Sequence, residues 1–481
     1  MNTRSFRITF CQLLWIPVLL VFALRATGDT PQPKASEYSP VPMEVPSGFS
    51  VAAVGDMILQ HPESMRHDVA GLVPYLKSTD VTFGNFENTT FDLHSFKGHP
   101  QAESGGSWLR GSPDVPMDVK AMGFNLVSRA NNHATDWGVE GMLETDHLLD
   151  AAGLVHAGTG TTQASAREAR FLQTAKGRIA LISAASSFTP MSRSMSPLGA
   201  APGRPGLNAV RARRVVLVTE EQMQALRRLH DAMPKGAVFS ETKIPDNELN
   251  LFDVRYRISD RSGLSFDMNQ TDLRENIQNV RNAKENADFL IFSMHAHQPG
   301  NWSQDPPDFL PKLAHAVIDN GADMFIGHGP HQLRGIEIYK GKPIFYSLGN
   351  FFFHENQQFP IVADMWEQFK GDPSTMTEVQ FSEERRLAMF KDDVFWESVI
   401  AVSRFANGQV SEIRLYPIDL SSLRDSQRGI PRLASPEKAQ TILQRLAKLS
   451  TPFGTPIEIR DNVGIIRISS AQIGQTALPK H

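Results

Sequence analysis

Several apolar, strand-like runs in this chain end directly in residues that carry carboxylate, amide or imidazole groups. The first run covers 49–57 and contains Gly55-Asp56 at its end, and the second covers 81–87. Strands that are buried on both faces of a layered α/β fold read as continuous apolar runs. In such sheets, ligands bind in the crevice outside the carboxyl ends of the strands. The pattern therefore predicts a layered α/β fold whose strand ends converge on one site.

Five places on the chain end a predicted strand and then present oxygen or imidazole side chains. These residues are Asp56, Asn85, Glu87, Asn132, His133, His295, His297, His328 and His331. Carboxylate, amide and imidazole ligands suit Zn, Mn or Fe, and after the segment 1–28 the sequence offers no thiolate. The set predicts a site for one or two divalent metal ions.

Each of these residues also has an ordinary interpretation. Gly55-Asp56 is a common turn, and His133 can cap a helix. His295 and His297 can be one exposed and one core histidine. Their order along the chain, and the motifs at 131–133 and 327–331 directly after apolar strands, favour the metal site. Other histidines lack this placement and are expected to be surface or core residues: His61, His67, His94, His99, His147, His156, His230 and His315.

The intervening segments alternate between strand and helix patterns, which is typical of a layered α/β fold. Helices are expected near 139–149, 219–233, 273–287, 308–319 and 437–449, and Asp272 is expected to cap the third of these. Hairpins are expected at 171–183, 336–346 and 399–415. Residues 190–268 begin with a stretch rich in Pro, Gly, Ser and Met, followed by three arginines, and are expected to form an insertion over the surface.

The beginning of the chain has the pattern of an export signal. Residues 1–28 contain two arginines, an apolar run and then small residues, which predicts a cleaved signal peptide or, alternatively, an uncleaved anchor. Residues 29–48 are rich in Pro, Ser and Thr and are expected to be a flexible linker. The one cysteine, Cys11, lies inside the signal, so a cleaved chain can form no disulfide. The expected location is the periplasm, the exterior or the outer face of the cytoplasmic membrane.

The overall charge argues against a nucleic-acid partner. The chain has 48 Lys and Arg against 52 Asp and Glu, a formal net charge of -4. Because nucleic-acid binding depends on neutralising phosphates with basic residues, no nucleic-acid partner is expected.

Motifs in residues 50–355 resemble the CapA family of poly-gamma-glutamate capsule proteins, within the calcineurin-like metallophosphoesterases. They lie at 54–57, 85–87, 123–138, 153–158, 321–323, 327–331 and 346–351. The resemblance implies a metallophosphatase-like sandwich of two mixed β-sheets flanked by helices. It implies a set of metal ligands: Asp56, Glu87, Asn132, His295, His328 and His331. It also implies that His133 is the catalytic acid or electrostatic stabiliser, with Asn85, His297 and Asn350 as auxiliary residues.

The chain departs from the family pattern at three positions. Metallophosphoesterases usually carry a histidine two residues after the first aspartate, where this chain has Ile58. Gly329 replaces a second histidine, and His295-Ala296-His297 replaces a His-Trp-Gly motif. His297 is expected to compensate, and the insertion at 190–268 is expected to cover the site or dock a partner.

The sequence supports more than one function. The first hypothesis is an envelope protein of capsule or exopolymer biosynthesis, with residues 49–420 as a metal-dependent hydrolase or transferase domain and 421–481 as a C-terminal extension packed on it. Its substrate would be a phosphoester or a gamma-glutamyl amide in an anionic polymer. The alternative is a non-catalytic polymer-binding accessory of a membrane-bound capsule synthase. A third possibility is a different reaction at the same metal, such as proton abstraction beside a carbonyl.

Overall fold

The computed structural model describes residues 44–101, 107–234, 244–354, 359–421 and 428–468. The predicted signal or anchor segment 1–28, with Cys11, lies outside these residues, as does the predicted linker before residue 44. The described residues, 44–468 with the gaps given above, belong to one compact unit. In the described ranges, no helix has both the length and the apolar character needed to cross a bilayer.

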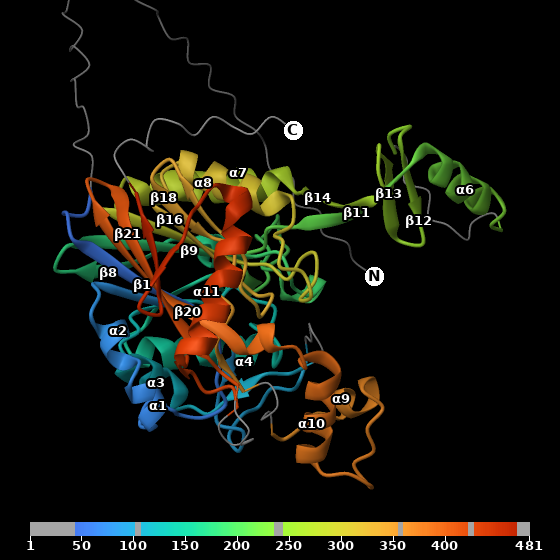
Figure 1. Ribbon diagram of the computed structural model, residues 1–481. Coiled ribbons are helices and arrows are strands. Elements are labelled where there is room, and N and C mark those ends of the chain that lie inside the picture. The colour runs from blue at the N-terminus through green and yellow to red at the C-terminus, as the bar shows by residue number, and fades with distance from the viewer. Residues whose placement is uncertain (1–43, 102–106, 235–243, 355–358, 422–427, 469–481) are drawn as a thin grey trace, which may run out of the picture. The chain divides into compact units, whose positions relative to one another are not determined.

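A large mixed sheet contains ten strands, and part of it can be followed in Figure 1. They are β1 (Phe49–Ile58), β2 (Val81–Phe86), β5 (Leu126–Ser128), β6 (Val155–Ala157), β19 (Asn350–Phe353), β20 (Glu397–Ala406), β21 (Gln409–Asp419), β22 (Arg432–Leu433), β23 (Glu458–Arg460) and β24 (Val463–Arg467). The main path runs β23-β24-β21-β20-β1-β2-β5-β6, and β19 also pairs with β1. The central strand β1 is parallel to β2 and β19 and antiparallel to β20, so the sheet is mixed.

A second mixed sheet contains six strands in the order β17-β18-β16-β15-β9-β8. Their bounds are β8 (Arg170–Thr174), β9 (Gly177–Ala185), β15 (Phe289–His295), β16 (Met324–His328), β17 (Ile336–Tyr339) and β18 (Lys342–Phe345). The four inner strands are parallel, and the predicted hairpins β8-β9 and β17-β18 form the two edges.

The two sheets pack face to face around a common apolar core. Alternate residues of β1, Val51 and Ala53, share this core with Ile291 and Ile326 of the second sheet. The intervening residues of β1, including Val54, face the opposite side of the sheet. Because both faces of β1 are covered, the strand is apolar throughout except at its end.

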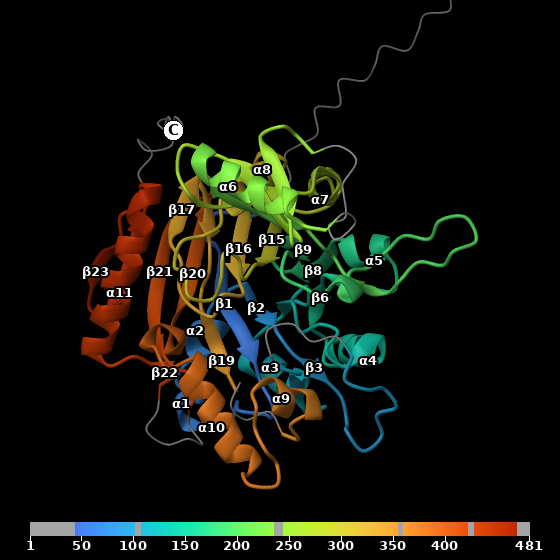
Figure 2. The same cartoon turned by 90° about the vertical axis from the view of Figure 1, so that its right-hand side faces the viewer.

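Helices cover the outer faces of both sheets (Figures 1 and 2). The outer face of the large sheet packs against α1 (His67–Ala70), α2 (Val73–Lys77), α3 (Val115–Met122) and α4 (Gly138–Ala151). The outer face of the second sheet packs against α7 (Gln270–Lys284) and α8 (Phe309–Asp319). Helix α11 (Pro436–Ser450) adds Ile442, Leu443 and Leu446 to the common core. The predicted sandwich of two mixed sheets flanked by helices is therefore confirmed.

The segment predicted as an insertion contains a small sheet of its own. The sheet has the order β12-β13-β11-β14, and its helix is α6. The bounds are β11 (Ala212–Val218), α6 (Glu220–Asp231), β12 (Glu248–Leu251), β13 (Val254–Ile258) and β14 (Gly263–Met268). The sequence predicted the helix and gave no indication of the sheet, whose strands are only partly buried and alternate weakly.

The remaining elements are short. They are β3 (Thr89–Thr90), β4 (Arg110–Gly111), β7 (Thr159–Gly160), α5 (Gln163–Arg167), β10 (Gly206–Leu207), α9 (Ala363–Gln368) and α10 (Glu378–Met389), with 3-10 turns η1 (Pro190–Ser192), η3 (Asp393–Trp396) and η5 (Thr451–Phe453). Helices α9 and α10 enclose a small core of their own that includes Met365, Trp366 and Phe381. Of the segment predicted as a C-terminal extension, β24 pairs with β21 and continues the large sheet.

The predicted N-terminal cap of α7 was wrong. The side chain of Asn269, not that of Asp272, accepts hydrogen bonds from the first backbone amides of the helix, at Thr271 and Asp272. The Asp272 carboxylate instead accepts from the guanidinium groups of Arg167 and Arg211 at 3.1 and 2.7 Å. A long-range pair of arginines thus takes the carboxylate that local sequence assigned to the cap.

Candidate metal centre

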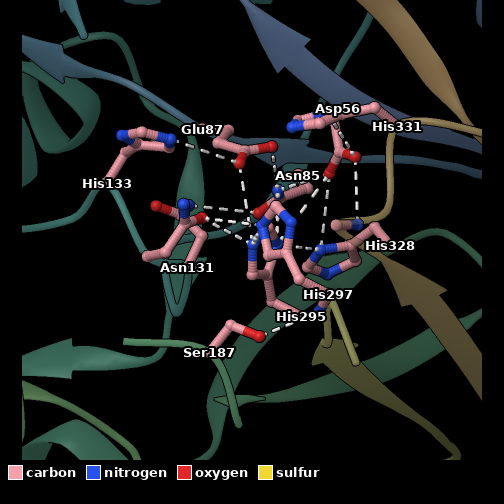
Figure 3. Close-up of polar contacts among 12 residues, drawn as sticks. Asp56, Asn85, Glu87, Asn131, His133, Ser187, His295, His297, His328 and His331 are labelled. Carbon is pink, nitrogen blue, oxygen red and sulfur yellow. Dashed lines mark hydrogen bonds and ion pairs between the residues drawn. The ribbon is translucent and has the colours of Figure 1, made fainter. Parts of the chain in front are cut away.

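The register of the two sheets brings the predicted site residues together. In the large sheet, Asp56 at the end of β1 lies opposite Asn85 of β2 and Asn350 of β19. In the second sheet, the last residues of β15 and β16, His295 and His328, are register partners. The carboxyl ends of strands from both sheets therefore meet at one place, and their side chains point toward one another (Figure 3).

The centre of the cluster is the imidazole of His295. Its Nδ1 lies 3.0 Å from Nδ1 of His328, and its Nε2 lies 2.9 Å from Nε2 of His297. The amide oxygen of Asn132 lies 2.7 Å from the same Nε2 of His295. A nitrogen of an imidazole ring carries at most one proton. Nε2 of His295 therefore cannot donate a full hydrogen bond both to Nε2 of His297 and to the amide oxygen of Asn132.

Two buried carboxylates face this group of rings. Asp56 Oδ1 lies 3.6 Å from Nδ1 of His328 and 4.0 Å from Nδ1 of His295. Glu87 Oε1 lies 3.6 Å from Nε2 of His295. Asn85 donates from Nδ2 to Asp56 at 2.8 Å and to Glu87 at 3.3 Å, so one amide orients both carboxylates.

The electrostatics of the site keep Asp56 ionised. Burial by itself raises the pKa of the Asp56 carboxyl, but the hydrogen bond with His331, together with the imidazoles of His328 and His295 that face the carboxylate, outweighs burial and lowers that pKa. A carboxylate that stays charged in a buried position is a strong ligand for a cation.

The three central imidazoles are held in the neutral form. Burial, followed by repulsion from His297 and His328, lowers the pKa of His295 well below its ordinary value. Burial, then His331, lowers the pKa of His297 to about 3, and burial lowers that of His328 to about 4. Metal-ligating histidines must be neutral, so these rings have the protonation state that ligation requires.

The donor set fits a divalent metal ion. Three groups of residues, all buried except the partly buried His297, could hold an ion: Asp56, His295 and His328; Glu87, His295 and His297; and Asp56, Glu87 and His331. Ligands bonded to an ion at roughly 2.0–2.1 Å lie about 2.9–3.4 Å from one another, in octahedral to tetrahedral geometry. The nitrogen and oxygen separations around His295, 2.7–3.6 Å, lie close to that range. The convergence of neutral imidazoles on two buried carboxylates could therefore hold a metal ion.

A histidine–aspartate pair lies beside the cluster. Nδ1 of His133 donates to Oδ2 of Asp136 at 2.7 Å, and the same oxygen accepts from the backbone amide of Leu109 at 2.8 Å. Asp136 keeps a proton on Nδ1 of His133 and fixes the orientation of the ring. The other ring nitrogen, Nε2, faces Glu87 Oε1 at 4.0 Å (Figure 3). His133 is thus oriented toward the same space as the carboxylates.

His331 and Gly329 depend on special backbone conformations. His331 has φ +58, in the left-handed region that few side chains adopt, and its Nδ1 contacts Asn350 Oδ1 at 2.9 Å and lies 3.6 Å from Asp56 Oδ2. The backbone amide of Gly329 donates to that Asp56 oxygen at 3.0 Å. A Cβ at Gly329, where φ is +116, would lie 3.0 Å from the Ala296 amide nitrogen, so glycine permits this close approach.

All the residues singled out in the sequence lie in this one cluster. The set comprises Asp56, Asn85, Glu87, Asn132, His133, His295, His297, His328, His331 and Asn350. Ile58 replaces a histidine of the wider pattern, and its side chain is buried among core residues on the helix side of the large sheet. His297 occupies a central position, because it approaches both His295 and Asn132.

Sequence reasoning missed several residues that orient the cluster. Asn131 donates to Asn85 Oδ1, and Ser293 contacts His328 Nε2 at 2.7 Å. Asn301 Oδ1 lies 2.6 Å from His297 Nδ1, and the Ser187 hydroxyl accepts from the His297 backbone amide. The spacing of Asp136, three residues after His133, was a signal that could have been read. Asn301 lies four residues after His297 in the same loop, whereas Ser187 follows β9, so the sequence spacing does not indicate its contact with His297.

A second histidine–glutamate group, His61, Glu63 and His354, has a different character. The ring of His61 approaches Glu63 at 2.7 Å, and Arg66 forms an ion pair with the same carboxylate. The backbone amide of Gln60 donates to Nδ1 of His354 at 3.3 Å, so the proton of the neutral His354 ring lies on Nε2, which faces Glu63 at 4.0 Å. A protonated Nε2 does not ligate a metal, and we interpret this group as a buried carboxylate held by cationic and N–H donors.

The fold and the cluster together define the class of protein: an α/β sandwich of the metallophosphatase type with a candidate metal centre at the strand ends. The model of the family described as bacterial capsule synthesis protein PGA_cap matches residues 50–355. The chain belongs to this capsule synthesis family, as the CapA-like motifs predicted.

Three relatives illustrate the range of similarity. The "Uncharacterized protein y4sH" of Sinorhizobium fredii is 48% identical over 438 residues, which cover 88% of this chain and 94% of that protein. The "PGA biosynthesis protein CapA" of Bacillus subtilis is 26% identical, covering 71% of each chain. The "Capsule biosynthesis protein CapA" of Bacillus anthracis is 24% identical, covering 71% of this chain and 67% of its own.

Proposed function

We propose that this chain is an exported protein of capsule or poly-gamma-glutamate biosynthesis whose metal centre hydrolyses or transfers a phosphoester or gamma-glutamyl amide bond. The observation that carries the proposal is the convergence of His295, His297 and His328 on the carboxylates of Asp56 and Glu87, next to the oriented ring of His133. The names of the Bacillus relatives support the pathway, and the cluster supports the chemistry.

The ligand residues of the proposed centre are Asp56, Glu87, Asn132, His295, His328 and His331, with His297 as a further ligand. A divalent ion held there supplies Lewis acidity toward a phosphoryl or carbonyl oxygen. Zn, Mn or Fe suits this set of nitrogen and oxygen donors. Asn85 and Asn350 hold Asp56 and His331 in orientation.

His133 supplies the proton transfer in the proposed reaction. Asp136 holds its Nδ1–H, so Nε2 is the atom that exchanges a proton with the leaving or attacking group. The ring is 3% exposed and lies beside Glu87, within reach of a group bound between the carboxylates. Ser186 and Ser187, at the end of β9, pair with Gln298 and fix the neighbouring loop that carries His297.

The burial of the centre favours one alternative, in which the metal stiffens a non-catalytic accessory of a polymer synthase. Asp56, Glu87 and His295 are fully buried, and such a site admits a small group rather than a long chain. In that case, loss of the metal lowers stability, and the protein shows no turnover either with or without the metal. A catalytic centre instead shows turnover that depends on His133.

The experiment uses purified residues 43–481, whose described part forms a compact unit. Metal content is measured by elemental mass spectrometry, and turnover is measured with an aryl phosphodiester and with gamma-linked polyglutamate. Asp56→Asn is expected to remove the metal, whereas His133→Asn keeps the metal and loses turnover. His147→Asn, at an exposed position of α4, is the matched control.

Three results decide between the proposals. Turnover that disappears in His133→Asn at unchanged metal content supports a catalytic centre. A metal-containing protein that turns over neither substrate, and whose melting temperature falls in Asp56→Asn, supports the accessory role. Metal content that is the same in Asp56→Asn and the wild type refutes the metal centre itself.

A further inference from the structure

A hairpin at the start of the insertion is ordered by its own hydrogen bonds. The backbones of Met195 and Arg204 exchange hydrogen bonds of 2.9 and 3.1 Å, and those of Leu198 and Ala201 exchange two of 3.0 Å. Figure 2 shows this segment, coloured green, projecting beyond α5. The tip is therefore held in a defined shape although it extends away from the packed core.

The tip of this hairpin is apolar and exposed. Leu198 is 84% exposed and Met195 is 37% exposed, and Met191 at the base is 68% exposed. Residues 194–203 contain no charged side chain and consist of Ser, Met, Pro, Leu, Gly and Ala. Single exposed apolar residues are ordinary. An ordered, projecting group of them indicates a surface that binds a membrane or another molecule.

The segment that contains the hairpin is basic in sequence, and Asp272, from outside this segment, pairs with Arg211 near its end. Residues 169–219 contain no Asp or Glu, whereas they contain eight basic residues: Arg170, Lys176, Arg178, Arg193, Arg204, Arg211, Arg213 and Arg214. Arg193 and Arg204 flank the apolar tip on its two strands. Arg193 and Arg204 lie side by side, because Nε of Arg204 donates a hydrogen bond to the backbone oxygen of Arg193 at 2.9 Å.

We propose that this hairpin, residues 191–204, docks on an anionic lipid bilayer, with the apolar tip in the interface and the flanking arginines against lipid phosphates. An apolar tip next to cationic side chains matches the two layers of a bilayer interface, acyl chains and phosphate headgroups. A second copy of this chain is a poorer match, because it would bring one cluster of arginines against another.

The hairpin is joined directly to the candidate metal centre. The Ser192 hydroxyl at its base lies 2.6 Å from that of Thr135 and 2.7 Å from that of Thr189. Thr135 lies between His133 and Asp136, the pair beside the metal ligands. Docking of the hairpin would therefore bring the candidate metal centre toward the lipid surface. The docking inference does not depend on the chemistry of the centre, and either can fail alone.

The test uses residues 43–481, because the apolar segment 1–28 would itself bind lipid and this unit contains no cysteine. A polarity-sensitive fluorophore is attached to Leu198→Cys, and the protein is mixed with vesicles of phosphatidylcholine with or without phosphatidylglycerol. We expect a blue shift with the anionic vesicles and a weaker one at high salt, because salt screens the arginines. The same fluorophore at Met65→Cys, 95% exposed and outside the hairpin, is expected to show no shift.

Unlabelled variants measure the two contributions to binding. Leu198→Asp is expected to weaken vesicle binding about tenfold or more, since it removes one buried apolar side chain and adds a negative charge. Arg193→Gln is expected to weaken binding to anionic vesicles and to leave binding to neutral ones unchanged. Circular dichroism and metal content are compared with the wild type to confirm folding.

Two outcomes overturn the inference. One is that the emission of the fluorophore at Leu198→Cys shows no blue shift with any vesicle, although the protein is folded. The other is concentration-dependent dimerisation that Leu198→Asp abolishes without any vesicle binding in the wild type, which would assign the tip to self-association.

Discussion

The Nε2 atoms of His295 and His297 lie 2.9 Å apart, and Nε2 of His297 also lies 3.2 Å from the amide oxygen of Asn132. Nδ1 of His297 is engaged with Asn301 Oδ1, an acceptor, so the proton of the neutral ring is on Nδ1. Nε2 of His297 therefore presents a lone pair toward the Asn132 oxygen, which is itself an acceptor, and toward Nε2 of His295. Acceptors that converge without enough protons between them are the arrangement that a cation stabilises.

The shared position of His295 predicts unequal effects on metal binding. His295 belongs to two of the candidate ligand groups, whereas His297 belongs to one of them. We expect His295→Asn to lose metal completely under conditions that saturate the wild type, and His297→Asn to keep part of it. Elemental analysis after dialysis, with titration calorimetry of the metal-free protein, measures both. Equal metal content in the two variants would contradict this assignment.

The pair of His133 and Asp136 predicts a loss of rate without a loss of metal. In Asp136→Asn, the amide no longer fixes the proton on Nδ1 of His133 as the carboxylate does. We expect turnover to fall by about 100-fold or more, with unchanged metal content and an altered pH–rate profile. Leu109, whose amide also binds Asp136, retains an acceptor in this variant. A rate within about twofold of the wild type would show that His133 needs no partner.

The buried ring of His354 predicts a loss of stability in acid. Burial, and then the charges of His61 and Arg66, lower the pKa of His354 to about 3. Because the folded pKa lies below the unfolded value, the unfolded chain binds a proton first, and stability falls as the pH drops from about 6.5 toward 3. At pH about 5, the penalty is on the order of 2 kcal/mol.

The variant His354→Asn keeps an acceptor for the Gln60 amide and cannot take up that proton. Between pH about 7.5 and 5, its free energy of unfolding is therefore expected to fall by roughly 2 kcal/mol less than that of the wild type. Urea denaturation of the metal-free proteins, at several pH values, measures the difference. Parallel pH curves for the two proteins would refute the role of His354.

The corrected cap of α7 predicts a local effect on stability. Asn269→Ala removes the acceptor for the amides of Thr271 and Asp272, and we expect a loss of about 1 kcal/mol in the free energy of unfolding. Gln270→Ala, at the first helical position, is the matched control and is expected to change stability little. Denaturant titrations distinguish the two, and an equal effect at both positions would show that the cap contributes nothing.

The sequence by itself determined the strands and their polar ends. β1 and β15 are buried on both faces, so each is largely apolar, and the polar residue near the end of each strand, Asp56 or His295, was recognisable for that reason. The hairpin β20-β21 was predictable because Asn407-Gly408 adopts positive φ angles that its turn requires. Hydrophobic periodicity and turn composition depend only on residues that are close together in the chain, so they can be recognised from the sequence alone.

Only the tertiary structure decided which side chains meet and which partners they choose. The backbone of His297 is held by Ser187, which is distant in sequence, and its ring is held by Asn301 of its own loop. Asp272 does not cap the helix because its carboxylate binds Arg167, which is more than a hundred residues away in sequence but next to it in space. The apolar hairpin tip became a docking candidate once its exposure was known. The physical reason is the same in each case: hydrogen bonds, ion pairs and burial depend on distances in space, which the spacing of residues along a chain does not fix.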